Sequence, residues 1–305
     1  MKRMLLVMNP YAGQRKGAKN LAAILEIFNR AGYMVNTYMT AGPGDGERMV
    51  KLLAPKVDIV VCCGGDGTFN ETVAGILAAG VDVPIGYIAA GSTNDFASSM
   101  GLSTDVLQAA KDIVAGEPHA VDVGMFGDRY FSYVASFGAF TRTSYATPQS
   151  LKNLLGHTAY LLSGVKEVAH IKSESLRMEL ADGRVIEGSY IFGAISNSTS
   201  VAGILTLPRD LVDMSDGKLE VMLVRAPKDL GEVTELIGAL QKHTYNCAMM
   251  TFFSAEGMKI TTSPQMPWTL DGERQEGVEQ VQISCRNRVV RVMRASQKKL
   301  PGEKA

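Results

Sequence analysis

The 305-residue sequence lacks an excess of charge of either sign, because 31 Lys and Arg residues balance 31 Asp and Glu residues. A dedicated nucleic-acid-binding protein usually has a basic excess. We therefore expect no nucleic acid as a partner, although a local basic patch remains compatible with this balance. Apolar residues make up 46% and charged residues 20%, so the chain can bury a substantial core. Its length suits two ordinary domains.

The sequence also lacks a long hydrophobic run. No apolar stretch reaches the roughly 18 residues that span a bilayer. The apolar run in MKRMLLVMNPYAG is too short for the core of a signal peptide. The four cysteines have no CxxC spacing, and we expect them to be buried reduced thiols: Cys62, Cys63, Cys247 and Cys285. These absences predict a cytoplasmic protein, which can still contact a membrane surface transiently.

Strand and helix signals alternate over the first 120 residues or so. In chain order, the expected elements are a strand at 4–9, a helix at 18–32, a strand at 33–40, a helix at 47–55, a strand at 57–63, a helix at 69–80 and a strand at 83–91. The continuous apolar run VDIVVCC is typical of a parallel strand that is buried on both faces. This order predicts a doubly wound α/β domain.

The remaining sequence is mostly β. Turns are expected at 127–128 and 182–183, strands at 218–226, 252–262 and 279–293, and helices at 150–168 and 230–240. We therefore expect a nucleotide-binding α/β domain at 1–123 and a mostly β, β-sandwich-like domain at 124–288. The C-terminal segment, 289–305, can pack back on the first domain.

Three loops rich in Gly, Asn, Ser and Thr follow expected strands of the first domain: NPYAGQRKG (9–17), GGDGTFNE (64–71) and GSTNDFA (91–97). The carboxyl ends of parallel strands form a ligand crevice, and helix N-termini after such loops attract anions. Each loop alone is compatible with a structural glycine turn, but three at one edge indicate a polyphosphate site. GxxxxGK[ST] and GxGxxG are both absent, so this is not a standard P-loop protein or dinucleotide binder.

Two acids interrupt these loops. A carboxylate inside a phosphate-binding loop repels phosphate unless a metal ion lies between them. Asp66 and Asp95 therefore indicate magnesium together with a nucleoside triphosphate. For Asp95 the alternative is a purely structural role as the N-cap of the following helix.

Two further pairs of acids lie in turns of the second domain. Asp213 and Asp216 are three positions apart and can hold a hard cation together with a backbone carbonyl. The alternative is a solvated Asp-Gly turn. Asp271 and Glu273 flank a glycine beside the only tryptophan, and the same two alternatives, catalysis or a solvated turn, apply to them.

Read together, these segments resemble the diacylglycerol kinase catalytic domain family, in its soluble bacterial lipid kinase branch, which is related to sphingosine kinases. The resemblance rests on seven ordered segments: NPYAG with Gly17, GGDGTFNE, GSTNDFASSMGL, GAFTRTSYATPQSLKNLLGHTAYLLSGVKE, NSTSVAGI, DLVDMSDGKLEV and LDGE. The GGDGT element alone is less specific, because NAD kinases and phosphofructokinases have similar loops.

The resemblance implies roles for individual residues. It implies an ATP site formed by Asn9, Pro10, Tyr11, Ala12, Gly13, Thr40, Gly64, Gly65, Asp66, Gly67, Thr68, Phe69, Asn70, Ser92, Thr93, Asn94 and Asp95. It implies that magnesium near the phosphates is organised by Asp66, Asp95 and Asp122. A second, structural magnesium site would use Asp213, Asp216 and the backbone oxygen of Lys218. The catalytic base would be Asp271 or Glu273, with Asp66 also essential for catalysis.

The implied function is phosphorylation of the free hydroxyl of diacylglycerol to give phosphatidic acid, with ATP and Mg²⁺, in phospholipid biosynthesis. Peripheral contact with the inner face of the cell membrane and a homodimer are also implied. One alternative is a kinase of another lipid or of a soluble alcohol, such as a sphingoid base, undecaprenol or NAD. A non-catalytic regulator is a second alternative, which the presence of all these acids argues against.

Overall fold

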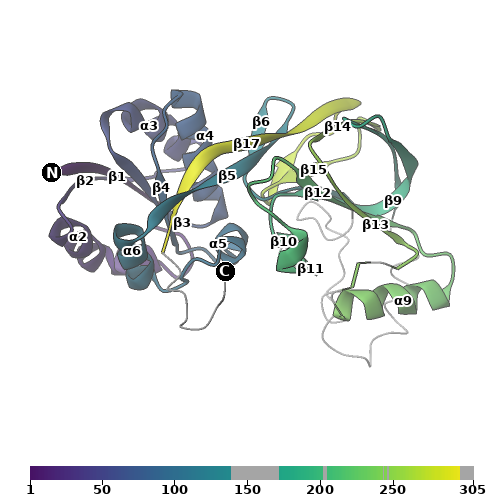
Figure 1. Ribbon diagram of the computed structural model, residues 1–305, viewed down its shortest axis with the longest axis horizontal. Coiled ribbons are helices and arrows are strands. Elements are labelled where there is room, and N and C mark those ends of the chain that lie inside the picture. Colours follow the sequence, from purple (N-terminus) through teal and green to yellow (C-terminus); the bar gives the residue numbers. More distant parts are fainter. Residues whose placement is uncertain (139–171, 202–204, 243, 246, 296–305) are drawn as a thin grey trace, which may run out of the picture. The chain divides into compact units, whose positions relative to one another are not determined.

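The computed structural model describes residues 1–138, 172–201, 205–242, 244–245 and 247–295 (Figure 1). The chain divides into two compact units. Unit 1 comprises Met1–Val121 and Arg288–Ala305, and unit 2 comprises Asp122–Asn287. The expected helix at 150–168 lies outside the described residues.

Unit 1 is built on a parallel sheet. β1 (Lys2–Met8) pairs with β2 (Tyr33–Met39) on one side and with β3 (Ile59–Gly64) on the other, and β3 pairs with β4 (Ile85–Ala89). The end of β17 (Gln280–Arg294) adds to β4 through Val292 opposite Ile85. β3 and β4 are buried along their whole length, which explains their continuous apolar sequences.

Helices cover both faces of this sheet, as Figure 1 shows. α2 (Leu21–Arg30) and α6 (Val106–Ala115) pack on the face that carries the even-numbered residues of β1. α3 (Asp45–Leu53) and α4 (Asp66–Ala79) pack against each other over the opposite face. The doubly wound α/β prediction is therefore confirmed. No helix among the described residues is long and apolar enough to cross a membrane.

Several helix boundaries differ from the sequence-based expectation. α4 begins at Asp66, three residues before the expected start, with Gly65 as its N-cap. The expected helix at 18–32 is divided at Asn20 into α1 (Lys16–Lys19) and α2. α5 (Asp95–Met100) was expected from FASSMG, whereas α6 was not expected, although the Asp105 carboxylate caps its first turn.

Unit 2 is mostly β, as predicted. Its strands are β5 (Glu117–Phe126), which begins in unit 1, β6 (Arg129–Phe131), β7 (Val134–Gly138), β8 (Glu174–Leu180), β9 (Val185–Ser196), β10 (Ser200–Val201), β11 (Leu205–Thr206), β12 (Leu219–Arg225), β13 (Met250–Ala255), β14 (Gly257–Thr262), β15 (Trp268–Leu270), β16 (Glu273–Gln275) and the first part of β17. The helical elements are η3 (Arg209–Leu211) and α9 (Leu230–Gln241). The expected strand at 252–262 is two strands, because the chain turns between Ala255 and Gly257.

The long strand β9 organises unit 2. Its first half pairs with β8, and its second half pairs with both β7 and β12. One apolar core collects alternate residues from these strands, with Trp268 at 0% exposure between the edges of Phe126 and Phe137. The short turn between β15 and β16 is thereby attached to a rigid part of the core.

The cysteine prediction is supported by the structure. All four cysteines are free thiols, and three of them are buried. Cys62 and Cys63 end β3, and burial raises the pKa of the Cys63 thiol to about 12. Such a thiol has almost no reactive thiolate at neutral pH.

Candidate active site

The loops after β1, β3 and β4 meet at the carboxyl edge of the unit 1 sheet. The Asn9 N–H donates to the Cys63 carbonyl at 2.9 Å, and the Ala90 N–H donates to the Gly64 carbonyl at 2.8 Å. The three loops predicted to bind phosphate are therefore neighbours, as the parallel order of the strands requires.

Glycines in these loops allow backbone to lie directly against backbone. A Cβ on Gly91 would lie 2.5 Å from the Cα of Gly65. Gly13 has a φ of 49°, and a Cβ there would collide with the Ala90 carbonyl. At these positions glycine is needed for contact between the loops, so the glycine density has a structural cause in addition to any ligand.

Asp66 joins two of the loops through its carboxylate. The Asp95 N–H donates to Asp66 Oδ2 at 3.1 Å, and the Phe96 N–H donates to Asp66 Oδ1 at 3.3 Å. Asp66 therefore begins α4 and also accepts the first two N–H groups of α5. Burial raises the pKa of Asp66, while these backbone donors oppose the rise. The carboxylate is held at the N-terminal ends of two helices, where anionic groups are stabilised.

The interpretation of Asp95 as an N-cap is wrong. Asn94 occupies the N-cap position of α5, in a left-handed conformation with a φ of 55°. Its side-chain amide accepts from the Gly91 N–H at 2.9 Å and donates to the Gly91 carbonyl at 3.1 Å. Asp95 is the first helical residue and is 5% exposed. Its backbone N–H donates to Asp66, so the two acids are neighbours, and the shared role of Asp66, Asp95 and Asp122 toward magnesium stays a prediction.

Glu71, a residue that the sequence reading did not select, positions the loop after β2. Its carboxylate accepts the Gly44 N–H at 2.7 Å and the Gly46 N–H at 2.9 Å. This loop follows directly from Thr40, which is buried. The sequence signal was present, because Glu71 is the last residue of GGDGTFNE.

The other predicted nucleotide residues lie in differing environments. Phe69 is fully buried and stacks on Phe96 at 4.1 Å and on Tyr87 at 4.6 Å between ring centroids, so its side chain belongs to the core. Tyr11 is 71% exposed. Ser92 and Thr93 are exposed, Thr68 is buried, and four residues are partly exposed: Pro10, Ala12, Gly67 and Asn70.

In unit 2, Asp122 fixes the acidic turn that precedes β12. The Gly217 N–H donates to Asp122 Oδ2 at 2.6 Å, and the Asp122 N–H donates to the Met214 carbonyl at 2.8 Å. Asn197 Nδ2 donates to the Asp122 carbonyl at 2.7 Å. Asp122 itself is fully buried. The structure therefore brings Asp122 together with the predicted metal-binding turn.

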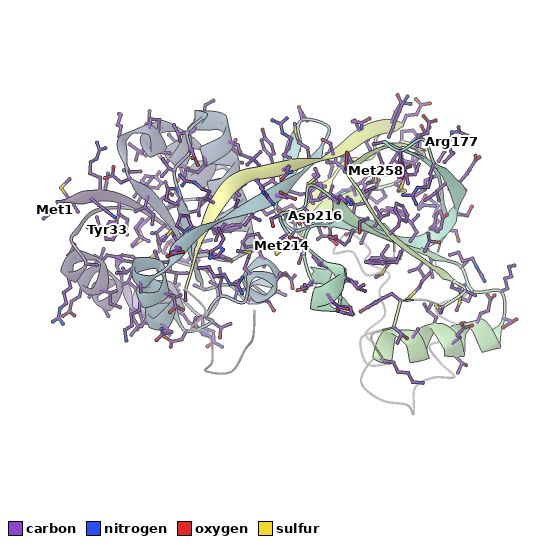
Figure 2. The ribbon with its side chains drawn as sticks, viewed as in Figure 1. Met1, Tyr33, Arg177, Met214, Asp216 and Met258 are labelled. Atoms are coloured by element: carbon purple, nitrogen blue, oxygen red, sulfur yellow. The ribbon has the colours of Figure 1, made fainter. Side chains whose placement is uncertain are left out.

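The turn itself presents carboxylate oxygens. Asp213 Oδ1 accepts from the N–H and hydroxyl of Ser215, and Asp216 Oδ1 accepts from the Lys218 N–H at 2.9 Å. Neither Oδ2 has a hydrogen bond to a described residue. Figure 2 labels Met214 and Asp216 on this turn.

These oxygen atoms fit a hard divalent cation such as Mg²⁺, which prefers carboxylate and carbonyl ligands. Two carboxylates and the Lys218 carbonyl would leave positions for water, which Mg²⁺ usually retains. Within the described residues, no three His, Cys, Asp or Glu side chains gather closely enough to bind one metal ion directly.

Asp271 and Glu273 differ sharply in environment. Asp271 is 6% exposed and has a φ of 49°. Its carboxylate accepts three backbone N–H groups, from Ser132 at 2.5 Å and from Tyr133 and Val134 at 3.0 Å. These donors use both carboxylate oxygens, which leaves little room for a hydrogen bond to a substrate.

Glu273, by contrast, has an exposed carboxylate. Its side chain is 55% exposed, and Oε2 lies 3.8 Å from Nη2 of Arg129. Arg129 also donates to the Gln275 side chain at 2.6 Å. The turn between β15 and β16 therefore holds one buried acid and presents the other to solvent.

The sequence was compared with protein families and with curated relatives. Residues 3–126 match the family model described as diacylglycerol kinase catalytic domain. A diacylglycerol kinase of Bacillus subtilis is 30% identical over 275 residues, which cover 90% of this chain and 90% of the relative. The chain belongs to the diacylglycerol kinase family. A diacylglycerol kinase of Staphylococcus carnosus is also 30% identical, over 89% of each chain.

Solved structures agree with this family at the level of the fold. A crystal structure of a diacylglycerol kinase from Bacillus anthracis has a TM-score of 0.75 and 20% identity, and the match covers 96% of this chain and 97% of that one. The family resemblance is therefore confirmed, and so is the prediction of an ATP-dependent phosphotransferase with an alcohol acceptor. No ligand contact of an individual residue follows from these matches.

The buried hydrogen bonds of Asp271 predict a large stability effect. Asp271→Asn keeps the size and tolerates the left-handed backbone, but it replaces one acceptor oxygen with an NH₂ group. Buried N–H groups then lose a partner, at about 1–3 kcal/mol each. We expect the unfolding free energy to fall by at least about 2 kcal/mol, measured by urea denaturation with the fluorescence of Trp268, the single tryptophan.

Asp182→Asn is the matched control. Asp182 also accepts one backbone N–H, from Arg184, but in an exposed turn. A small effect within about 0.5 kcal/mol is expected there. An equally small effect of Asp271→Asn would contradict the structural role of that carboxylate.

Proposed function

We propose that this chain phosphorylates the free hydroxyl of diacylglycerol to give phosphatidic acid, with ATP as donor and Mg²⁺ as cofactor. The observation that carries the proposal is the 30% identity to the B. subtilis diacylglycerol kinase over 90% of both chains. The arrangement around Asp66 supports it, because the strand-end loops and two helix N-termini of unit 1 gather at one acid.

The nucleotide is assigned to unit 1. The first turn of α4 has N–H groups without intrahelical partners, and this end of the helix attracts phosphate. The loops at 9–17 and 91–95 border the same edge of the sheet. Phosphoryl transfer depends mainly on positioning and charge neutralisation, so a rigid set of backbone donors is well suited to the task.

Mg²⁺ is proposed as the cation that offsets the repulsion between the Asp66 carboxylate and the phosphate groups. When bound, it would neutralise negative charge on the phosphate groups. Asp66 and Asp95 would hold it in unit 1. In unit 2, Asp213, Asp216 and the Lys218 carbonyl would hold a structural ion, with Asp122 fixing the turn.

We propose Glu273 as the general base and Asp271 as a positioning residue. A base must be able to accept the proton of the substrate hydroxyl. The Asp271 carboxylate already accepts three N–H groups, whereas Glu273 is exposed and, among the described residues, its carboxylate contacts Arg129 in a 3.8 Å ion pair. Asp271 would set the conformation of the turn from which Glu273 projects.

Transfer of radiolabelled phosphate from ATP tests the function. Diacylglycerol in mixed micelles is the expected acceptor, compared in parallel with sphingosine, undecaprenol and NAD. Asp66→Ala is expected to reduce transfer by at least about 10³-fold, because it removes both a helix-joining carboxylate and the proposed metal ligand. Its circular dichroism spectrum should match that of the wild type.

Labelling of one of the other acceptors instead of diacylglycerol would replace the proposed substrate. No labelling of any acceptor would favour a non-catalytic regulator. Near-normal turnover by Asp66→Ala would remove Asp66 from the chemistry.

Glu273→Gln separates the base from the positioning residue. We expect kcat to fall by about 10²–10⁴-fold, with the KM for ATP and the unfolding free energy unchanged, because the side chain is exposed and its ion pair is long. Steady-state kinetics and urea denaturation measure both quantities. If kcat is unchanged in Glu273→Gln but is lost in Asp271→Asn at retained stability, the two roles must be exchanged.

Two further properties are proposed from the same family relationship. A diacylglycerol substrate stays in the bilayer, so we expect peripheral docking at the inner face of the cell membrane through exposed cations such as Lys2, Arg3, Arg15 and Lys16. Equal sedimentation with neutral and anionic vesicles would contradict a charge-driven contact. The chain is also expected to be a homodimer, and a monomeric mass by gel filtration with light scattering would exclude this.

A further inference from the structure

Glu220 is a buried acid to which neither the sequence reading nor the proposed mechanism assigns a role. It is the second residue of β12, opposite Ser196 of β9 and Ser254 of β13. Its neighbours Leu219 and Val221 belong to the apolar core, so the alternation of the strand places Glu220 on the opposite face. It is nevertheless only 2% exposed.

One oxygen of this carboxyl group has no partner. Glu220 Oε2 is buried and makes no hydrogen bond with any described residue. An ionised carboxylate that is buried without a partner costs several kcal/mol.

A second unpartnered oxygen belongs to Asn197, which bonds with Asp122. Asn197 is fully buried and uses Nδ2 for the Asp122 carbonyl, while Oδ1 has no hydrogen bond to a described residue. Asn197 directly follows Ser196, the strand neighbour of Glu220. Two buried acceptor oxygens therefore come from β12 and from the residue that directly follows β9, and Asn197 bonds with the backbone of Asp122, whose carboxylate fixes the acidic turn.

This region has acids but little that can neutralise them. Asp213, Asp216 and Glu220 form no ion pair with a described residue, and Lys218 is exposed. A neutral water alone could satisfy the two oxygens, but it would leave the acidic charge uncompensated. A hydrated divalent cation supplies both the donors and the positive charge.

We propose that Glu220 and Asn197 bind the water shell of a divalent cation held by the Asp213–Lys218 turn. The absence of three closely grouped acids among the described residues argues for contact through water instead of direct ligation. This inference rests on the magnesium site of the proposed function and adds residues to it. Such outer partners typically change metal affinity by about 10–100-fold.

Mg²⁺ binding to the full-length chain tests this proposal. The protein is stripped with EDTA, transferred to metal-free buffer and titrated with Mg²⁺ by calorimetry, and thermal unfolding is followed by Trp268 fluorescence with and without the ion. Glu220→Gln is expected to raise the Kd for Mg²⁺ by about 10–100-fold. Without Mg²⁺, its Tm should be equal to or higher than that of the wild type, because a buried charge has been removed.

Glu174→Gln is the matched control. Glu174 is also a buried glutamate of unit 2, at 8% exposure, but its carboxylate pairs with Lys172 at 2.9 Å. Its substitution should leave the Kd for Mg²⁺ unchanged. Asp213→Asn should abolish the binding and thereby identify the titrated site as the turn.

Three results would overturn the proposal. They are an unchanged Kd in Glu220→Gln, an equal loss of Tm in that variant with and without Mg²⁺, and no Mg²⁺ binding by the wild type. Phosphate transfer to diacylglycerol by the wild type is measured separately. Transfer with unchanged binding in Glu220→Gln rejects this inference alone, whereas Glu220-dependent binding without transfer rejects the proposed activity alone.

Discussion

The strand-end loops of unit 1 are held together by one half-buried carboxylate. Asp66 starts one helix and accepts the first two N–H groups of another, so the ends of β3 and β4 cannot separate without leaving donors unpaired. The close approach of Gly65 to Gly91 follows from the same constraint, because only glycine allows backbone contact at this distance. Glu71 adds the loop after β2 to this hydrogen-bonded arrangement, because its carboxylate accepts two backbone N–H groups of that loop. The loops are thus ordered by hydrogen bonds within the protein, and such order is the preorganisation that the proposed phosphoryl transfer would require.

Unit 2 uses carboxylates in the same way. Asp122 holds the Asp213–Lys218 turn, and Asp271 holds the backbone that leads into β7. Each is buried, and each accepts backbone donors. The neighbouring acids Glu220 and Glu273 have fewer partners, and they are the ones for which cation binding and proton transfer are proposed. In unit 2, the acids that accept backbone donors hold the turns in place, and the proposed chemistry falls to the acids with fewer partners.

Much of the fold and the position of the candidate site could be predicted, because both follow from short, local patterns in the sequence. Buried parallel strands are continuous apolar runs, and GGDG, NPYAG and GSTND interrupt them at the strand ends. The expected helix boundaries were wrong where a residue type is common both in loops and at the ends of helices. The glycines of GGDGT indicated a loop, yet α4 already begins at Asp66. Aspartate is a common N-cap residue, which suggested this role for Asp95. In the structure, Asn94 occupies the N-cap position of α5 in a left-handed conformation.

Other features depend on distant contacts and could not be read from the sequence. LEVMLV is an ordinary strand sequence, and nothing in it shows that Glu220 becomes 2% exposed between β9 and β13. Asp271 and Glu273 have the same chemistry two positions apart. Only the backbone of Ser132 to Val134, more than a hundred residues earlier, distinguishes them.

The division of the chain has a consequence for its engineering. Unit 1 contains both ends of the sequence, and the chain leaves it once, after Val121 in β5, and returns once, at Arg288 in β17. Unit 2 is therefore a single uninterrupted insertion into the fold of unit 1. Replacing it as one segment requires only two junctions, one in β5 and one in β17, and neither junction touches the hydrogen bonds around Asp66.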